Sequence, residues 1–318
     1  MTTTTAIATA GLTKHYPGVA ALTDLTLDVP SGSIFGFLGP NGAGKSTTLK
    51  VLAGLSRPTS GSATVAGVPV GAGPAYRRHV GYLAQEPQFY DWMSGRETLR
   101  FVASLFGGGD AARTGIDAIL ARVGLADAAD RRTSTYSGGM RQRLGIGQAL
   151  VGDPSVLLLD EPVSALDPIG RREVLDLMRE LRGEVTVFYS THILDDVERV
   201  SDHVAILDGG RLVQASPTAE LLAGFGRDEL RVAIGGADDS TAIALAGLPG
   251  IASVEPTGRD GEIRTYLVRL EPGVTTAVQA AITRFGADRG LAITENHLVH
   301  VGLEDAFLRL VSTKERAA

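Results

Sequence analysis

The stretch SIFGFLGPNGAGKST, residues 33–47, decides the fold of this chain. Its apolar beginning, Ser33–Leu38, predicts a short buried strand, and a helix is expected from Lys45 to about Leu55. The loop between them matches the pattern G-x-x-x-x-G-K-[ST] at every fixed position. Glycines let backbone N–H groups curve around phosphate oxygens, and the start of a helix attracts an anion. The stretch therefore predicts a binding site for a nucleoside triphosphate.

All nine residues of this loop are expected to contact the nucleotide: Gly39, Pro40, Asn41, Gly42, Ala43, Gly44, Lys45, Ser46 and Thr47. In this pattern the lysine reaches the β- and γ-phosphates, and the hydroxyl of Ser46 binds Mg²⁺. A glycine-rich turn that matches the pattern by chance is the alternative. The strand before the loop and the helix after it favour the phosphate site.

A second apolar run, Val156–Leu159, ends in the acids Asp160 and Glu161. Ligands of open α/β sheets bind at the carboxyl ends of the strands, where these two side chains are delivered. Asp160 suits the Mg²⁺ coordination shell, and Glu161 suits a base that polarises an attacking water. An acidic pair after a strand is by itself usually a loop or a helix cap. The phosphate loop upstream favours the catalytic interpretation.

A third element, Tyr136–Met140, opens a predicted helix over Met140–Val151. Ser137 and the free N–H groups at the start of that helix are placed to face an anion. Ser-Gly-Gly alone is an ordinary helix cap. Its position between the phosphate loop and the Asp-Glu pair makes it a candidate site.

Taken in chain order, six motifs resemble those of an ATP-binding cassette: Gly39–Thr47, Gln85, Ser137–Met140, Asp160–Glu161, Ser164–Asp167 and His192. The chain resembles the ATPase subunit of an ABC transporter over about residues 6–222. The resemblance implies an α/β P-loop NTPase cassette, with a RecA-like core, an antiparallel β subdomain and a helical subdomain. It also implies ATP and Mg²⁺ as cofactors and ATP hydrolysis as the activity.

The resemblance assigns roles to single residues. It implies four catalytic residues: Lys45, Gln85, Glu161 and His192. It implies three metal contacts: Ser46, Gln85 and Asp160. It adds six contacts to ATP outside the phosphate loop: Tyr16, Ser137, Gly138, Gly139, Met140 and Asp167. In the family Tyr16 stacks on adenine, His192 contacts the γ-phosphate, and Asp167 lies on the loop that joins two sites.

The motif around Ser137 departs from the commonest family pattern, because Tyr136 replaces Leu and Met140 replaces Gln. A Met at that position resembles the branch that powers type-2 exporters of drugs, polysaccharides, haem and sodium. The segment Gly302–Leu308 also resembles that branch. Export is therefore expected over import.

The sequence shows no obvious arginine finger for a single site of this kind. In GTPases such a finger raises the hydrolysis rate by roughly 10³–10⁵-fold. In the family the Ser137 motif of a second copy fills this role, in a head-to-tail sandwich around two ATPs. The expected partners are a second copy and transmembrane permease subunits. The aromatic loop Gln85–Met93 is expected either to receive a permease segment or simply to pack within the helical subdomain.

The 318 residues allow about two domains. The pattern changes near Ala223–Asp228, so we expect a cassette over residues 1–225, with its helical subdomain at about 86–153. An accessory α+β domain is expected over residues 226–318. Its predicted β-α-β-β-α-β order suggests a ferredoxin-like unit, followed by a last helix at 304–311.

Composition excludes several classes of site and protein. There are no cysteines, which excludes disulfides and thiolate metal sites, and the net charge of −6 disfavours a nucleic-acid binder. No signal sequence or membrane-spanning run is evident, so we expect a cytoplasmic chain held at the inner face of the membrane by permease subunits. The alternatives are a soluble cassette protein of DNA repair or translation, and a P-loop kinase or GTPase.

Overall fold

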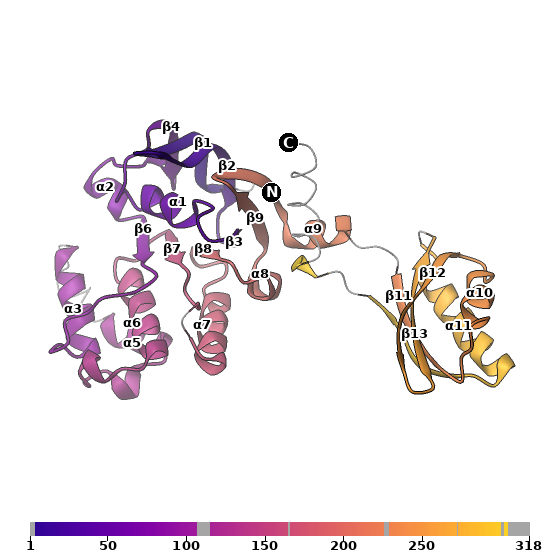
Figure 1. The fold of residues 1–318 in the computed structure, drawn as a ribbon. Helices are drawn as coiled ribbons and strands as arrows, with labels where there is room; N and C mark the ends of the chain where they lie inside the picture. The colour runs from indigo at the N-terminus through magenta and orange to yellow at the C-terminus, as the bar shows by residue number, and fades with distance from the viewer. Residues whose placement is uncertain are drawn as a thin grey trace. The chain divides into compact units, whose positions relative to one another are not determined.

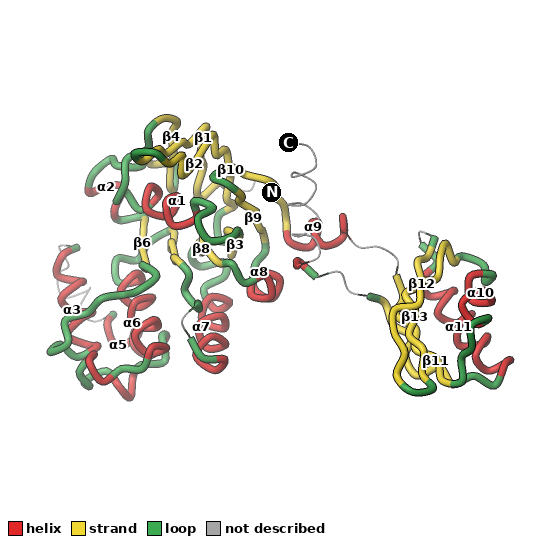
Figure 2. Tube along the Cα trace, viewed as in Figure 1, coloured by secondary structure: helices red, strands yellow, loops and turns green. Residues whose placement is uncertain are grey.

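The computed structural model describes residues 4–106, 115–164, 166–225, 229–271, 273–299 and 302–304. Contacts divide these residues into two compact units, one ending at Leu221 and one beginning at Leu222. Figures 1 and 2 show the elements of both units. Each unit is described by itself.

The first unit opens with an antiparallel sheet in the order β2-β1-β4-β5. Its strands are β1 (Thr5–Tyr16), β2 (Val19–Pro30), β4 (Ser60–Val65) and β5 (Val68–Pro69). Along β2 buried Leu25, Leu27 and Val29 alternate with exposed Thr26 and Asp28. This alternation is typical of a sheet with one face on the core and the other in water.

The second sheet of this unit carries the nucleotide motifs, in the order β10-β9-β3-β8-β7-β6. Its strands are β3 (Ile34–Leu38), β6 (Val80–Leu83), β7 (Val156–Asp160), β8 (Thr186–Thr191), β9 (His203–Asp208) and β10 (Arg211–Pro217). All pairs are parallel except β9 with β10. Every residue of β3, β7 and β8 is buried, as continuous apolar runs predict for strands covered on both faces. The motifs therefore meet at one edge, where these strands end.

Helices complete the unit. They are α1 (Lys45–Leu52), α2 (Pro74–Arg77), α3 (Gly95–Leu105), α5 (Ile116–Arg122), α6 (Gly138–Leu150), α7 (Pro168–Glu180) and α8 (Leu194–Val200), and α9 (Thr218–Phe225) begins in this unit and continues past its end at Leu221. Helices α3, α5 and α6 pack on one another and form the helical part of the unit (Figure 1). Ser94 begins α3 with a capping box that includes Glu97, which fixes the start of that helix.

The second unit has the order β11 (Glu229–Gly235), α10 (Thr241–Ala246), β12 (Ile251–Asp260), β13 (Ile263–Leu270), α11 (Thr275–Arg289) and β14 (Ala292–Leu298). Its sheet order is β12-β13-β11-β14, with antiparallel neighbours. Both helices cover one face (Figure 1). This is the predicted ferredoxin-like arrangement. The helix expected at 304–311 falls almost entirely outside the described residues.

Across the described ranges, none of the helices is both long enough and apolar enough to span a bilayer.

Candidate functional site

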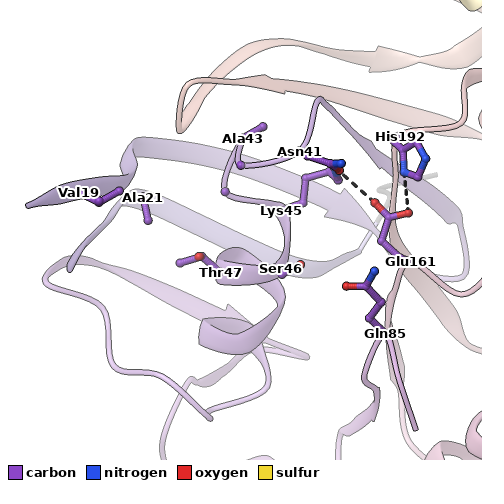
Figure 3. A pocket seen from close by; sticks show the side chains of 12 residues that line it. Val19, Ala21, Asn41, Ala43, Lys45, Ser46, Thr47, Gln85, Glu161 and His192 are labelled. Carbon is purple, nitrogen blue, oxygen red and sulfur yellow. Dashed lines mark hydrogen bonds and ion pairs between the residues drawn. The ribbon is translucent and has the colours of Figure 1, made fainter. Parts of the chain in front are cut away.

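A polar cavity of about 400 Å³ opens at the edge where the parallel strands end (Figure 3). Its lining comes from β2, the phosphate loop, the start of α1 and the ends of three further strands. The lining residues are Val19, Ala21, Asn41, Gly42, Ala43, Gly44, Lys45, Ser46, Thr47, Gln85, Glu161 and His192. The cavity thus gathers residues that are far apart in the sequence.

The phosphate loop is held against its neighbours at glycines. Gly44 has a φ of +101°, and a Cβ there would lie 2.4 Å from the carbonyl oxygen of Ala21. A Cβ on Gly39 would lie 2.3 Å from the carbonyl oxygen of Leu207. Helix α1 begins at Lys45, so its first N–H groups, which have no partner within the helix, lie at the cavity. The loop therefore offers the backbone donors that a phosphate group requires.

Lys45 lies among oxygen atoms. Its Nζ donates to the carbonyl oxygens of Gly39 (2.7 Å) and Pro40 (3.1 Å) and lies 3.5 Å from Oε1 of Glu161. The Lys45 and Glu161 side chains are only 6% and 7% exposed. A buried ammonium with an acidic partner is strongly favoured over an unpaired one, so the charge is held at the cavity.

Asp160 is held by two hydroxyls. Its Oδ1 accepts from Ser46 Oγ at 2.9 Å and from Ser190 Oγ at 2.7 Å, and Ser190 Oγ accepts from the backbone N–H of Glu161 at 2.9 Å. Within the described ranges no group of three or more His, Asp or Glu residues forms a metal cage. One carboxylate beside one hydroxyl fits Mg²⁺, which takes few protein ligands and completes its shell with water and phosphate oxygens.

Tyr82 on β6 lies close enough to Asp160 to be influenced by its charge. Burial, followed by the Asp160 carboxylate, raises the pKa of Tyr82 to about 12. The phenol therefore stays neutral at physiological pH and does not act as a base at this edge.

Glu161 has a positive φ of 48°, in the left-handed region that non-glycine residues rarely adopt. Its Oε2 lies 3.0 Å from His192 Nδ1, a contact that Figure 3 marks with a dashed line. The His192 side chain is 47% exposed. Backbone strain of this kind clusters at functional sites, because the surrounding structure holds the residue in an unfavourable conformation.

Tyr16 is not among the residues that line the cavity. It ends β1, is 42% exposed, and lies under Lys14, whose Nζ is 4.8 Å from the ring centroid. Val19 and Ala21, from the strand that follows, line the cavity instead. The adenine contact of Tyr16 stays a prediction.

The Ser137 motif also lies outside the lining, as does Asp167. Ser137 caps α6, where its Oγ accepts from the N–H of Met140 at 3.3 Å. Asp167 caps α7, where its Oδ1 accepts from the N–H of Gly170 at 2.8 Å. The two helix starts are neighbours, since a Cβ on Gly139 would lie 3.7 Å from Gly170 Cα. Neither helix start therefore contributes to the lining of the cavity in its own chain.

Three residues of the site escaped the sequence analysis: Ser190, Val19 and Ala21. The position of Ser190, two residues before His192, was the one available signal. Val19 and Ala21 offered none, because small apolar residues in a strand are common.

Comparison with known proteins identifies the family. The ABC transporter profile matches residues 22–164. The fluoroquinolones export ATP-binding protein of Mycobacterium tuberculosis is 39% identical over 253 residues, covering 78% of this chain and 83% of that protein. The daunorubicin resistance ATP-binding protein DrrA3 of Streptomyces coeruleorubidus is 34% identical over 318 residues, covering 98% of each.

This chain belongs to the ABC transporter family. The structure of cbiO1 from Clostridium perfringens, described as part of an ABC transporter complex, is similar, with a TM-score of 0.64 and 28% identity over 69% of this chain and 91% of that one. The ABC subunit therefore has the predicted α/β cassette fold and is an ATP-binding ATPase of the transporter class. Neither relative supports a role in DNA repair or translation.

Proposed function

We propose that this ABC subunit is the ATPase of an exporter and works as two copies that enclose two ATP molecules head to tail. One observation carries the proposal. The cavity of one chain contains Lys45, Glu161 and His192, but Ser137–Met140 lie outside its lining and at the exposed start of α6. Each complete site would then need the α6 start of a second copy.

Within one copy, different residues would bind the triphosphate, accept the proton and position the base. The loop N–H groups and Lys45 bind the triphosphate, while Glu161 takes a proton from the attacking water. His192 holds the Glu161 carboxylate in position through the 3.0 Å contact. Mg²⁺, held by Ser46, Asp160 and Gln85, would neutralise charge on the β- and γ-phosphates.

The second copy contributes anion-stabilising donors. Ser137 and the N–H groups of Gly138 and Gly139 would face the γ-phosphate held by the first copy, with Met140 and Asp167 beside them. A helix N-terminus favours negative charge, so it can take the place of an arginine finger. Tyr16 would stack on the adenine. Residues 1–225 would form the cassette, and residues 226–318 an accessory domain that adds contacts between copies.

Export is supported by the names of the two relatives, one linked to fluoroquinolone export and one to daunorubicin resistance. Met140 supports the same branch. The permease subunits would dock on the helical part of the cassette and hold it at the inner membrane face. The helical part of the cassette has a hollow of about 340 Å³, which is lined by Gln88, Phe89, Tyr90, Thr98, Phe101, Val102 and Gln148. Its aromatic lining suits an apolar segment of a partner.

The test is Glu161→Gln, which keeps the shape of the side chain but removes the base. With ATP and Mg²⁺, this variant is expected to hydrolyse at least about 10²-fold more slowly and to elute as a closed dimer at size exclusion. Glu161→Gln combined with Lys45→Ala is the control, because loss of ATP binding should return the monomer. A Glu161→Gln chain that stays monomeric at saturating ATP would contradict the two-copy site.

A further inference from the structure

Helix α7 lies between two helices that are tied to site residues. Helix α8 follows His192 after one residue, and α6 begins at the Ser137 cap. Helix α7 itself begins at the Asp167 cap. It forms one ion pair with each neighbour, through Arg171 to α8 and through Glu173 to α6.

In the ion pair with α8, the carboxylate partner is buried. Asp196, in the first turn of α8, is 2% exposed. Both Nε (2.8 Å) and Nη2 (2.7 Å) of Arg171 contact its Oδ1. The other oxygen, Oδ2, has no hydrogen-bond partner in the described part of the chain. Separating α7 from α8 would therefore leave a buried carboxylate without its contacting cation, which is strongly unfavourable.

The ion pair with α6 is anchored by backbone contacts. Arg143 Nη2 lies 3.5 Å from Oε2 of Glu173, and its Nη1 donates to the carbonyl oxygens of Val123 (3.3 Å) and Gly124 (3.0 Å). The Arg143 side chain is 16% exposed and that of Glu173 is 47% exposed. One guanidinium thus joins the end of α5, the body of α6 and α7.

We propose that Arg171 and Glu173 are positioning residues that couple the His192 loop of a chain to its own Ser137 helix. The coupling rests on the proposed two-copy arrangement, in which His192 serves one ATP and Ser137 serves the other. A displacement of α8 when ATP contacts His192 would move α7 and, through Glu173, α6. The state of one site would then bias the other, which is the definition of coupling between sites.

The experiment compares three single variants of the full chain. Asp196→Asn weakens the pair with α8, Glu173→Gln weakens the pair with α6, and Asp176→Asn is the matched control. Asp176 pairs with Arg179 on the same helix, at 3.1 Å and with both side chains partly exposed. Arg179 Nη2 also donates to the carbonyl oxygen of Arg199 on α8 (2.9 Å), a bond whose two partners Asp176→Asn leaves in place. Each variant is measured for ATP affinity, for the Hill coefficient of ATP hydrolysis, and for its melting temperature.

Two sites allow a Hill coefficient of up to about 2. Asp196→Asn is expected to reduce the wild-type value toward 1, Glu173→Gln to reduce it by less, and Asp176→Asn to leave it unchanged. ATP affinity should stay at the wild-type value in all three. The double variant Asp196→Asn with Glu173→Gln should be no worse than Asp196→Asn alone, because both interrupt one connection. Arg171→Lys keeps the charge and should retain most of the cooperativity.

A wild-type Hill coefficient in the folded Glu173→Gln and Asp196→Asn variants would overturn the inference, as would an equal loss in Asp176→Asn. If Asp196→Asn does not fold, Glu173→Gln decides, since its side chain is half-exposed. These failures differ from that of the proposed function, which would show as an ATP-loaded Glu161→Gln chain that stays monomeric.

Discussion

At the scale of single residues, Ser190 joins the two acids of the site. Its hydroxyl donates to Asp160 and accepts from the backbone N–H of Glu161. Ser190 is fully buried, so neither contact can be replaced easily by water. The same N–H belongs to the residue with a φ of +48°, so this bond helps to hold the strained backbone.

Ser190→Ala removes both contacts and is expected to lower kcat by about 10–100-fold, the usual range for residues that orient the ligands of a site. The KM for ATP should change little, because the phosphate loop is untouched. Steady-state hydrolysis measures both values. Ser190→Thr, which keeps the hydroxyl, is the control and should retain more activity. Equal activity of Ser190→Ala and the wild type would contradict a positioning role.

At the scale of elements, the loop after β6 and the face of α3 form one exposed aromatic surface. Tyr90 packs against Trp92 (ring centroids 4.8 Å apart) and against Phe101 of α3 (6.1 Å). Trp92 is 66% exposed, and the ring of Phe89 lies 5.4 Å from the Arg141 guanidinium. An exposed cluster of aromatic rings is typical of a surface that meets a partner.

Replacing both Phe89 and Trp92 with Ala should leave ATP affinity unchanged, because neither residue lines the nucleotide cavity. Affinity for the permease should fall by at least about tenfold, as for loss of an aromatic anchor, and transport should fall with it. Binding and transport assays in reconstituted vesicles measure these effects. Ile243→Ala is the control, since Ile243 is 77% exposed on α10 in the other unit. Normal transport by the double variant would contradict this docking surface.

The sequence predicts an element well when the residues that form its pattern are contiguous in the chain. The strand Ile34–Leu38, the phosphate loop and α1 are contiguous, so their pattern predicts them together. Helix α7 was not predicted, although Val174, Leu175, Leu177 and Met178 form a buried helical face. Strand β10 and helix α8 also escaped prediction, since each is only seven residues long.

The arrangement of the site was beyond sequence reasoning for a different reason. Asp160, Ser190 and Ser46 belong to three strands or helices whose order in the sheet is set by long-range pairing. The proposed roles of Tyr16 and Ser137 would depend on contacts with a nucleotide or a second copy. Sequence patterns predict that such residues gather at one sheet edge, but not which hydroxyl bonds which acid.

At the scale of the whole molecule, each of the two units has a cluster of buried apolar side chains of its own among the described residues. One cluster of buried apolar side chains belongs to the first unit and includes Phe35, Phe37 and Phe188. Another belongs to the second unit and includes Leu230, Tyr266 and Ile282. A domain with its own core can in principle fold alone.

A chain ending at Gly226 is therefore expected to keep ATP binding and a cooperative melt. In the Glu161→Gln background, its ATP-dependent dimer should be weaker than that of the full chain, because the accessory domain is proposed to add contacts between copies. Sedimentation over a range of concentrations gives the two dissociation constants. Identical values would contradict that role for residues 226–318.

The central position of β3 has a consequence for synthesis. Ile34–Leu38 is wholly buried, yet its two neighbours in the sheet, β8 and β9, end only at Thr191 and Asp208. A ribosome adds about 5–20 residues per second, so this apolar strand emerges on the order of ten seconds before its partners. During that interval the antiparallel hairpin of β1 and β2, whose contacts are local, can already form. The nucleotide cavity cannot form until β7, β8 and His192 have also been made, so ATP can stabilise the growing chain only after that point.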